Sequence, residues 1–269
     1  MAVRILLINI LFFVFSGLAT AASKSDLAKE KRWEEQIVPS LLVGEDIKLK
    51  AAGTEFLGLY AEPTTDSVLG GVIILHGIGV HPAWPDVVDP LRMQLPDYGW
   101  HTLSLQMPIL PNEAEEKQYP PLFDEVPPRV QAGVDYLKAK GIKNIVIIGH
   151  SMGVTMAHYY LANKPDAAVK AMICASCGPG YPDDPRMDSV ANFKKIKLPY
   201  LDIYGSADID RVLSTAPQRA AIAKQMKNKN YTQKKVEGAN HFYTGMQDEL
   251  IKLVRGWLQT NAAGKEIKK

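Results

Sequence analysis

A serine, an aspartate and a histidine occupy positions from which their side chains could perform nucleophilic catalysis. Ser151 is the centre of the segment GHSMG, between an apolar stretch, NIVII, and an amphipathic stretch that starts at Met152. This G-x-S-x-G pattern is a nucleophile elbow, a sharp strand-to-helix turn that exposes the serine hydroxyl. Gly149 and Gly153 supply the small neighbours that a strained turn needs. A serine that only caps a helix does not need glycine on both sides, so the pattern favours a nucleophile.

A serine hydroxyl is a weak nucleophile at neutral pH and needs a base that is oriented by an acid. Asp208 follows the strand-like segment PYLDIYG, and His241 follows the last strand-like segment, in GANHF. The order serine, aspartate, histidine is typical of proteins with this elbow. Asp210 is the competing acid, and Asp208 is preferred because it follows the strand more directly. The rival bases do not lie at a strand end late in the chain: His76, His81, His101, His150 and His158.

An acyl-transfer site also needs two hydrogen-bond donors for the oxyanion that develops on the substrate. Met152 begins the stretch after the nucleophile, where backbone N–H groups of a helix start are free to bind an anion. The segment LHGIG ends another apolar strand, and its glycine lets the backbone turn towards the serine. We therefore expect the backbone N–H groups of Ile78 and Met152 to form the oxyanion hole. The side chain of His76 is expected to be structural.

The elements that must position these residues alternate between strand and helix. Strands are predicted at 47–49, 54–61, 71–75, 100–105, 144–148, 168–175, 199–204 and 231–236 from apolar runs or period-two alternation. Helices are predicted at 89–95, 127–140, 152–162, 215–226 and 242–258. The first two strands should be an antiparallel pair, and the later alternation predicts a mainly parallel sheet that helices cover on both faces.

Two stretches, 108–126 and 178–198, do not fit this alternation and are interpreted as excursions above the sheet. Ligands bind at the carboxyl ends of the strands in such sheets, so these excursions should line a substrate pocket. In the first, apolar side chains would face an acyl chain and the acids would face solvent: Ile109, Leu110, Tyr119, Leu122 and Phe123 against Glu113, Glu115 and Glu116. The alternative is a Pro-rich surface loop without substrate contact.

The first 22 residues have the pattern of a secretory signal peptide. Arg4 precedes an apolar run over 5–15, and small residues over 19–22 suit cleavage. The run is too short for about 30 Å of hydrocarbon, although an uncleaved anchor is the alternative. We expect an exported protein, periplasmic or extracellular, with no stable membrane span after processing. The predicted organisation is a signal peptide over 1–22, a polar segment over 23–45, one domain over 46–260 and a polar tail over 261–269.

Charge and cysteine content exclude several kinds of partner. The 31 Lys and Arg against 29 Asp and Glu leave a formal charge of +2, so nucleic acid is not an expected partner. The Lys-rich stretch 224–235 is interpreted as a solvated helix end and strand start. The two cysteines, Cys174 and Cys177, cannot form a four-ligand zinc site and end a strand-like run instead of opening a helix. They predict a buried structural thiol pair or a local disulfide.

The segments LHGIG, GHSMG, GSAD and GANHF resemble the α/β-hydrolase superfamily over 47–258. The phrases HGIGVHPAWPDVVDPLR and GWHTLSLQMPILP are similar to a group of exported bacterial α/β-hydrolase-like proteins. The resemblance implies an α/β-hydrolase fold with a sheet of about eight strands and the triad at its carboxyl edge. Neither excursion is long enough for the large lid that is common in lipases.

These residues predict a serine hydrolase that acts on a carboxylic ester or a related acyl bond through a Ser151-His241-Asp208 mechanism. Its partner would be a small-molecule acyl substrate, and no metal or organic cofactor is expected. Two alternatives use the same scaffold: a non-catalytic protein that binds a cell-envelope partner in the cleft, and a secreted acyltransferase.

Overall fold

The computed structural model describes residues 23–163, 165–264 and 267–268. The predicted signal peptide, 1–22, lies outside the described residues. Among the helices that are described, none has both the length and the apolar character that a membrane crossing requires.

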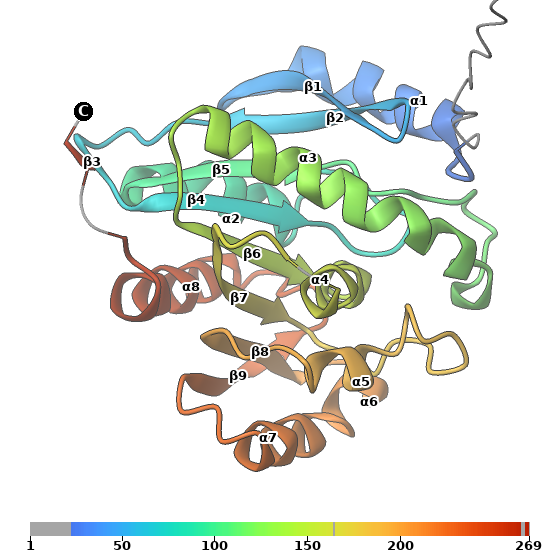
Figure 1. Cartoon of the computed structure of the whole chain (residues 1–269), viewed down its shortest axis with the longest axis vertical. Helices are drawn as coiled ribbons and strands as arrows, with labels where there is room; N and C mark the ends of the chain where they lie inside the picture. Colours follow the sequence, from blue (N-terminus) through green and yellow to red (C-terminus); the bar gives the residue numbers. More distant parts are fainter. Residues whose placement is uncertain (1–22, 164, 265–266, 269) are drawn as a thin grey trace, which may run out of the picture.

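An eight-stranded sheet runs through the centre of the molecule (Figure 1). Its strands are β1 (Glu45–Ala51), β2 (Thr54–Ala61), β4 (Gly70–Leu75), β5 (Trp100–Leu105), β6 (Ile145–His150), β7 (Val169–Ala175), β8 (Tyr200–Ala207) and β9 (Tyr231–Asn240). Their spatial order is β1-β2-β5-β4-β6-β7-β8-β9. The β1–β2 and β2–β5 pairs are antiparallel, and the strands from β5 to β9 are parallel. The predicted antiparallel pair and mainly parallel sheet are confirmed.

Helices cover the sheet on both faces (Figure 1). One face carries α3 (Val126–Ala139), α4 (Met152–Ala162), α5 (Ser189–Phe193) and α7 (Ala216–Gln225). The other face carries α2 (Val88–Gln94) and α8 (Gln247–Asn261). Because apolar side chains are buried on both faces, the central strands consist of continuous apolar runs.

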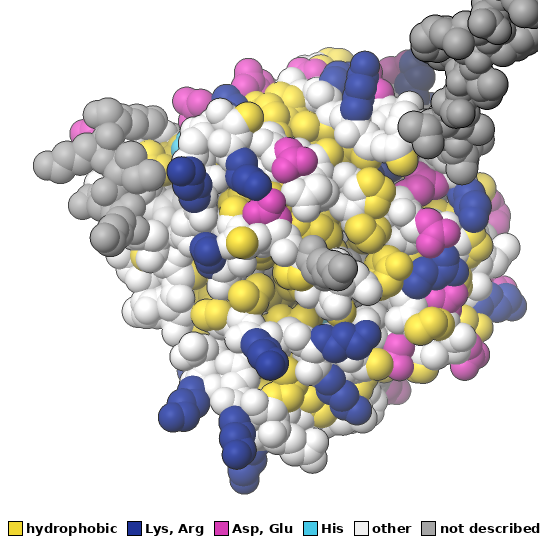
Figure 2. All heavy atoms as spheres, in the orientation of Figure 1, with side chains coloured by type: hydrophobic (Ala, Val, Ile, Leu, Met, Phe, Trp, Pro, Cys, Tyr) yellow, Lys and Arg dark blue, Asp and Glu magenta, His cyan; other side chains and the backbone are white. Residues whose placement is uncertain are grey.

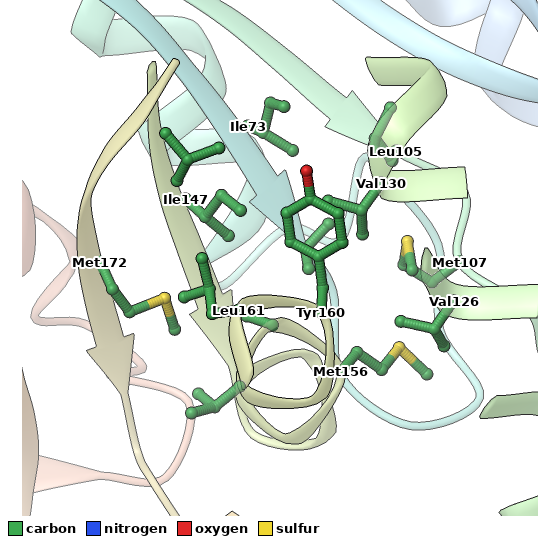
Figure 3. Close-up of a cluster of buried hydrophobic side chains, with 14 of the residues drawn as sticks. Ile73, Leu105, Met107, Val126, Val130, Ile147, Met156, Tyr160, Leu161 and Met172 are labelled. Atoms are coloured by element: carbon green, nitrogen blue, oxygen red, sulfur yellow. The ribbon is translucent and has the colours of Figure 1, made fainter. Parts of the chain in front are cut away.

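The central strands divide their side chains between two hydrophobic cores. In β4, Ile73 and Leu75 pack with α3 and α4, whereas Val72 and Ile74 pack with α2 and α8. Successive side chains of a strand point to opposite faces, so one strand contributes to both cores. Figure 3 shows the first core, where Ile73 and Ile147 of the sheet face the helical residues Val130 and Met156. Each fully buried side chain of this size contributes about 1.5–3 kcal/mol.

The last helix begins later than predicted. The sequence predicted a helix from Phe242, but α8 starts at Gln247. The side-chain oxygen of Asn240 accepts hydrogen bonds from the backbone N–H groups of Phe242 and Thr244, which holds this stretch in turns. Tyr243 and Gly245 both have positive φ angles, which a helix excludes. The turns place His241 at the end of β9 instead of at a helix start.

The predicted polar segment over 23–45 contains a helix, α1 (Leu27–Ile37), followed by a 3₁₀ turn, η1 (Val38–Ser40). Ile37 packs on Leu57 of β2, and the Trp33 ring lies 4.0 Å from the His81 ring. The charged residues of α1 made the segment look solvent-exposed in the sequence. One of them, Glu30, is buried in an ion pair with Arg129.

The predicted polar tail over 261–269 includes strand β10 (Ile267–Lys268), which pairs with β3 (Ser67–Val68) in a separate two-stranded sheet. The remaining short helices are η2 (Leu95–Tyr98), η3 (Glu116–Gln118), η4 (Pro120–Glu125) and α6 (Asp210–Leu213).

The Lys-rich stretch 224–235 forms the end of α7 and the start of β9, as predicted. Its side chains at Lys224, Lys227 and Lys234 are exposed. Figure 2 shows Lys and Arg side chains gathered at the end of the molecule that carries α7 and β9.

Candidate active site

Ser151, His241 and Asp208 lie together at the carboxyl edge of the sheet. Ser151 follows β6, Asp208 follows β8, and His241 follows β9. The Oγ atom of Ser151 lies 3.0 Å from Nε2 of His241, and Nδ1 of His241 lies 2.6 Å from Oδ1 of Asp208. If Nδ1 carries the proton and donates it to the carboxylate, Nε2 is free to accept the serine proton. The three residues predicted from chain order therefore have the geometry of a nucleophile, a base and an orienting acid.

The turn at Ser151 is strained, as expected of an elbow. Ser151 has a φ of 52°, where a side chain is unfavourable. A Cβ atom at Gly153 would lie 2.2 Å from the carbonyl oxygen of Leu75, and one at Gly149 would lie 2.7 Å from the backbone of Gly153. Both glycines are required because the elbow helix approaches the neighbouring backbone so closely.

Four donors surround the carboxylate of Asp208. Oδ1 accepts from His241 and, at 2.8 Å, from the backbone N–H of Ile209. Oδ2 accepts from the hydroxyl of Ser176 at 2.6 Å and from the backbone N–H of Gly205 at 3.4 Å. Burial raises the pKa of Asp208, but the hydrogen bonds from His241 and Ser176 lower it more, so its pKa lies below the usual value.

Asp210, the competing acid, starts α6 and is exposed, so it does not occupy the buried position beside His241. The contact from Ser176 was not anticipated from the sequence. The only signal for it is that Ser176 follows the end of β7, where parallel strands bring their carboxyl ends together.

Among the buried rival bases, burial lowers the pKa of His76 to about 3, of His150 to about 4 and of His158 to about 4. His76 lies beneath the site, where its Nε2 accepts from the backbone N–H of Met107 at 2.9 Å. His158 is placed between Ser189 and Tyr200. These histidines are held neutral by their surroundings and serve as structural hydrogen-bonding groups.

A pocket of about 280 Å³ opens beside Ser151. Ile78 and Met152, the expected oxyanion donors, both line it. In the described part of the chain, neither backbone N–H donates to a turn or loop carbonyl. A Cβ atom at Gly77 would lie 3.5 Å from Cβ of Ser151, so the loop after β4 passes directly beside the nucleophile. The apolar part of the remaining wall is formed by Val80, Trp84, Ile209, Val212 and Phe242, and Thr155 and Ser176 also line the pocket.

The prediction that apolar residues of 108–126 line this pocket is wrong for all five. Ile109, Tyr119, Leu122 and Phe123 are buried in the protein core, and Leu110 packs against that core. Phe123 faces Tyr159 of α4, with ring centroids 5.9 Å apart. The 3₁₀ turns fold this excursion onto α3 and α4, so its apolar side chains pack into the core.

Glu116, which was expected to face solvent, lines the pocket instead. It forms a bidentate ion pair with the guanidinium of Arg211. The same guanidinium donates a hydrogen bond to the carbonyl oxygen of Gly180 at 2.7 Å. This ion pair joins both excursions to α6. The second excursion reaches the pocket through Gly178 and Gly180.

Cys174 and Cys177 are free, fully buried thiols. Burial raises the pKa of Cys174, which disfavours the reactive thiolate. The structure therefore shows the buried thiol pair and not the disulfide. Within the described ranges, no group of three or more His, Cys, Asp or Glu side chains is placed to hold a metal ion.

Solved structures with a similar fold include serine hydrolases, esterases and peptidases. An α/β serine hydrolase homologue from Coxiella burnetii has a TM-score of 0.63 and 18% identity, with 80% of this chain and 98% of that chain covered. An esterase from Pyrococcus furiosus has a TM-score of 0.65 and 19% identity, covering 81% and 93%. A serine hydrolase without a lid from Xanthomonas campestris has a TM-score of 0.59 and 13% identity, covering 81% and 94%.

The chain thus has the α/β-hydrolase fold, and the described residues include no large lid. It belongs to the family described as "Protein of unknown function (DUF3530)", which matches residues 18–121 and 110–260. No curated protein matches the chain.

Proposed function

We propose that this protein is a serine hydrolase that cleaves a carboxylic ester through a covalent acyl-enzyme. The observation that carries the proposal is the continuous chain of contacts from Ser151 Oγ through the imidazole of His241 to Asp208, at 3.0 and 2.6 Å, at the wall of an accessible pocket. A serine that serves only as a helix cap has no need of an aligned base and a buried carboxylate.

In this mechanism, Nε2 of His241 takes the proton of Ser151 as Oγ attacks the ester carbonyl carbon. The backbone N–H groups of Ile78 and Met152 donate to the oxyanion of the tetrahedral intermediate. Asp208 stabilises the imidazolium, which then protonates the departing alcohol. Water enters and attacks the acyl-enzyme with His241 as the base, which releases the acid and restores the serine hydroxyl.

Three features support an ester with a compact acyl group. Alcohols leave more readily than amines, and the described residues place no lid over the site, so water has access. The pocket is about 280 Å³ and mainly apolar, which suits a short acyl chain. Two proteins of similar fold are named as an esterase from Pyrococcus furiosus and an esterase domain from Rhodothermus marinus.

We also propose that the protein is exported and acts in the periplasm or outside the cell. The pattern over 1–22 supports this proposal, and the two residues that follow it are bound to the domain. The hydroxyl of Ser23 donates to Glu125 at 2.7 Å, and the backbone N–H of Lys24 donates to the same carboxylate at 2.6 Å. Removal of residues 1–22 would leave these anchors in place. Cell fractionation and N-terminal sequencing of the expressed protein test this: we expect a soluble exported form that begins near Ser23, whereas a full-length cytoplasmic form would contradict it.

The hydrolase proposal is tested with nitrophenyl esters of graded acyl length and with Ser151→Ala. We expect highest kcat/KM for short chains and a loss of about 10⁴-fold or more in the variant. The thermal transition should change little, because among the described residues the Ser151 side chain has a hydrogen bond to His241 alone. Equal hydrolysis by the variant would disprove the assignment of Ser151. Product analysis with an added alcohol acceptor separates hydrolysis from acyl transfer.

A further inference from the structure

Ser176 holds an unfavourable backbone conformation at the edge of the candidate active site. It follows the last residue of β7, is fully buried, and has a φ of 58°. Glycine adopts this left-handed region without a steric penalty, whereas a residue with a Cβ atom does not. The described chain uses glycine at most of its positive-φ positions, so a serine at this one requires an explanation.

The hydroxyl of Ser176 contacts the one carboxylate oxygen that His241 does not use. It donates to Oδ2 of Asp208 at 2.6 Å, while Oδ1 accepts from Nδ1 of His241 at 2.6 Å. A short hydrogen bond to an ionised carboxylate is among the stronger kinds. With both oxygens held by separate donors, rotation of the carboxylate about its Cβ–Cγ bond would break a contact.

The backbone around Ser176 is tied to both ends of the triad. The carbonyl oxygen of Ala175 accepts from the backbone N–H of Ser151 at 3.1 Å, and the backbone N–H of Ser176 donates to Ile203 of β8 at 2.8 Å. The carbonyl oxygen of His241 lies 3.2 Å from the Ser176 hydroxyl. One turn therefore contacts the nucleophile, the base and the acid.

We propose that Ser176 is a positioning residue for the triad, whose hydroxyl fixes Oδ2 of Asp208 so that Oδ1 stays aligned with Nδ1 of His241. This inference rests on the proposed function, because alignment matters for catalysis only if Ser151 reacts. The strained φ is retained because the left-handed turn is what directs the hydroxyl towards the carboxylate. If the residue only had to form the turn, glycine would form it better.

Two substitutions separate the hydroxyl from the strain. Ser176→Ala removes the hydroxyl and keeps the strain, and Ser176→Gly removes both. Lys227 provides a matched control, because it is exposed, has a φ of 55° and lies at the end of α7, outside the pocket. Lys227→Gly and Lys227→Ala repeat the same comparison away from the site.

We expect both Ser176 variants to lose about ten- to a hundredfold in kcat with a smaller change in KM, because Ser176 lines the pocket but its hydroxyl donates to the acid. Ser176→Gly should nevertheless have a higher Tm than Ser176→Ala, since glycine relieves the strained φ. Lys227→Gly should likewise have a higher Tm than Lys227→Ala, and both should keep the kcat of the parent protein. A parent-like kcat in Ser176→Gly would overturn the proposal, and so would a kcat that follows Tm across the four variants.

A crystal structure of Ser176→Gly distinguishes failure of this inference from failure of the proposed function. We expect the Asp208 carboxylate to turn, so that the contact between Oδ1 and Nδ1 of His241 lengthens beyond 3.2 Å. An unmoved carboxylate contradicts the positioning role even if no ester is ever hydrolysed by the parent. A turned carboxylate in a protein that hydrolyses no ester supports the positioning role and disproves the enzymatic one.

Discussion

Asp208 and His241 are joined by a 2.6 Å hydrogen bond although 33 residues separate them in the chain. Asp208 is buried at the end of β8, whereas the neighbouring Asp210 is exposed at the start of α6. Asp208→Asn should therefore lower kcat much more than Asp210→Asn, because an amide holds His241 in the wrong tautomer. The comparable change in a serine protease costs about 10⁴-fold. Steady-state kinetics of both variants with one nitrophenyl ester measure this, and a larger loss in Asp210→Asn would reassign the acid.

The pocket wall predicts which residues control acyl length. Val212 is buried and lines the pocket, so Val212→Ala should raise the kcat/KM of longer esters relative to shorter ones. One additional buried methylene contributes about 0.8 kcal/mol, or about fourfold. Phe123→Ala is the contrast, because Phe123 is in the core: it should cost about 3–5 kcal/mol of stability and leave the chain-length profile unchanged. An altered profile in Phe123→Ala, with none in Val212→Ala, would contradict this account of the wall.

The ion pair between Glu116 and Arg211 predicts a preference for uncharged acyl groups. Glu116 neutralises the guanidinium inside the pocket, so a carboxylate on the substrate has to compete with it. Glu116→Gln removes this competitor and should raise kcat/KM for an ester with an acyl carboxylate, relative to a neutral ester of the same length. An ion pair between Arg211 and the substrate carboxylate should change this ratio of kcat/KM values severalfold. If the ratio of the two substrates does not change, Arg211 does not reach the acyl group.

The buried neutral histidines predict that acid weakens the fold. Burial lowers the pKa of His76 to about 3 and of His150 and His158 to about 4, below the unfolded value of about 6.5. Between these values the unfolded chain binds more protons than the folded protein. Stability is therefore complete above about pH 6.5 and is lost as the pH falls towards 4, by about 1.4 kcal/mol per pH unit for each histidine.

Urea unfolding across this pH range measures the effect. His158→Gln keeps groups that can bond with Ser189 and Tyr200 but cannot take up a proton, so its stability should fall less steeply with acid. An equal slope in the variant and the parent would show that His158 does not remain neutral in the folded protein.

The triad could be predicted from the sequence because each of its members lies directly after a strand. The glycines around Ser151 mark the elbow locally, and the apolar runs before Asp208 and His241 locate the neighbouring strand ends. The residues that line the pocket could not be predicted in the same way. An apolar side chain such as Phe123 can pack in a core or line a pocket. Which of the two occurs depends on the path of the chain. Glu116 lines the pocket because Arg211, far along the chain, binds it.

Ser176 shows the same limitation at the level of a single contact. Its role depends on a positive φ angle and on the proximity of Asp208, 32 residues away. Neither property has a local sequence signal, because serine is common in turns for other reasons. Helix α1 was missed for a related reason: its charged residues suggested solvent, but Lys29 and Glu30 are buried against the domain.

The most direct test of the central claim is covalent labelling of the full-length and processed protein with a fluorophosphonate probe, followed by peptide mass spectrometry. We predict one adduct per chain, located on Ser151, because only an aligned base makes a serine hydroxyl reactive enough to displace fluoride. Labelling should be absent in Ser151→Ala and strongly slowed in His241→Gln, while Lys227→Gly labels at the parent rate. An unlabelled parent protein, or an adduct that persists in Ser151→Ala, would contradict the account.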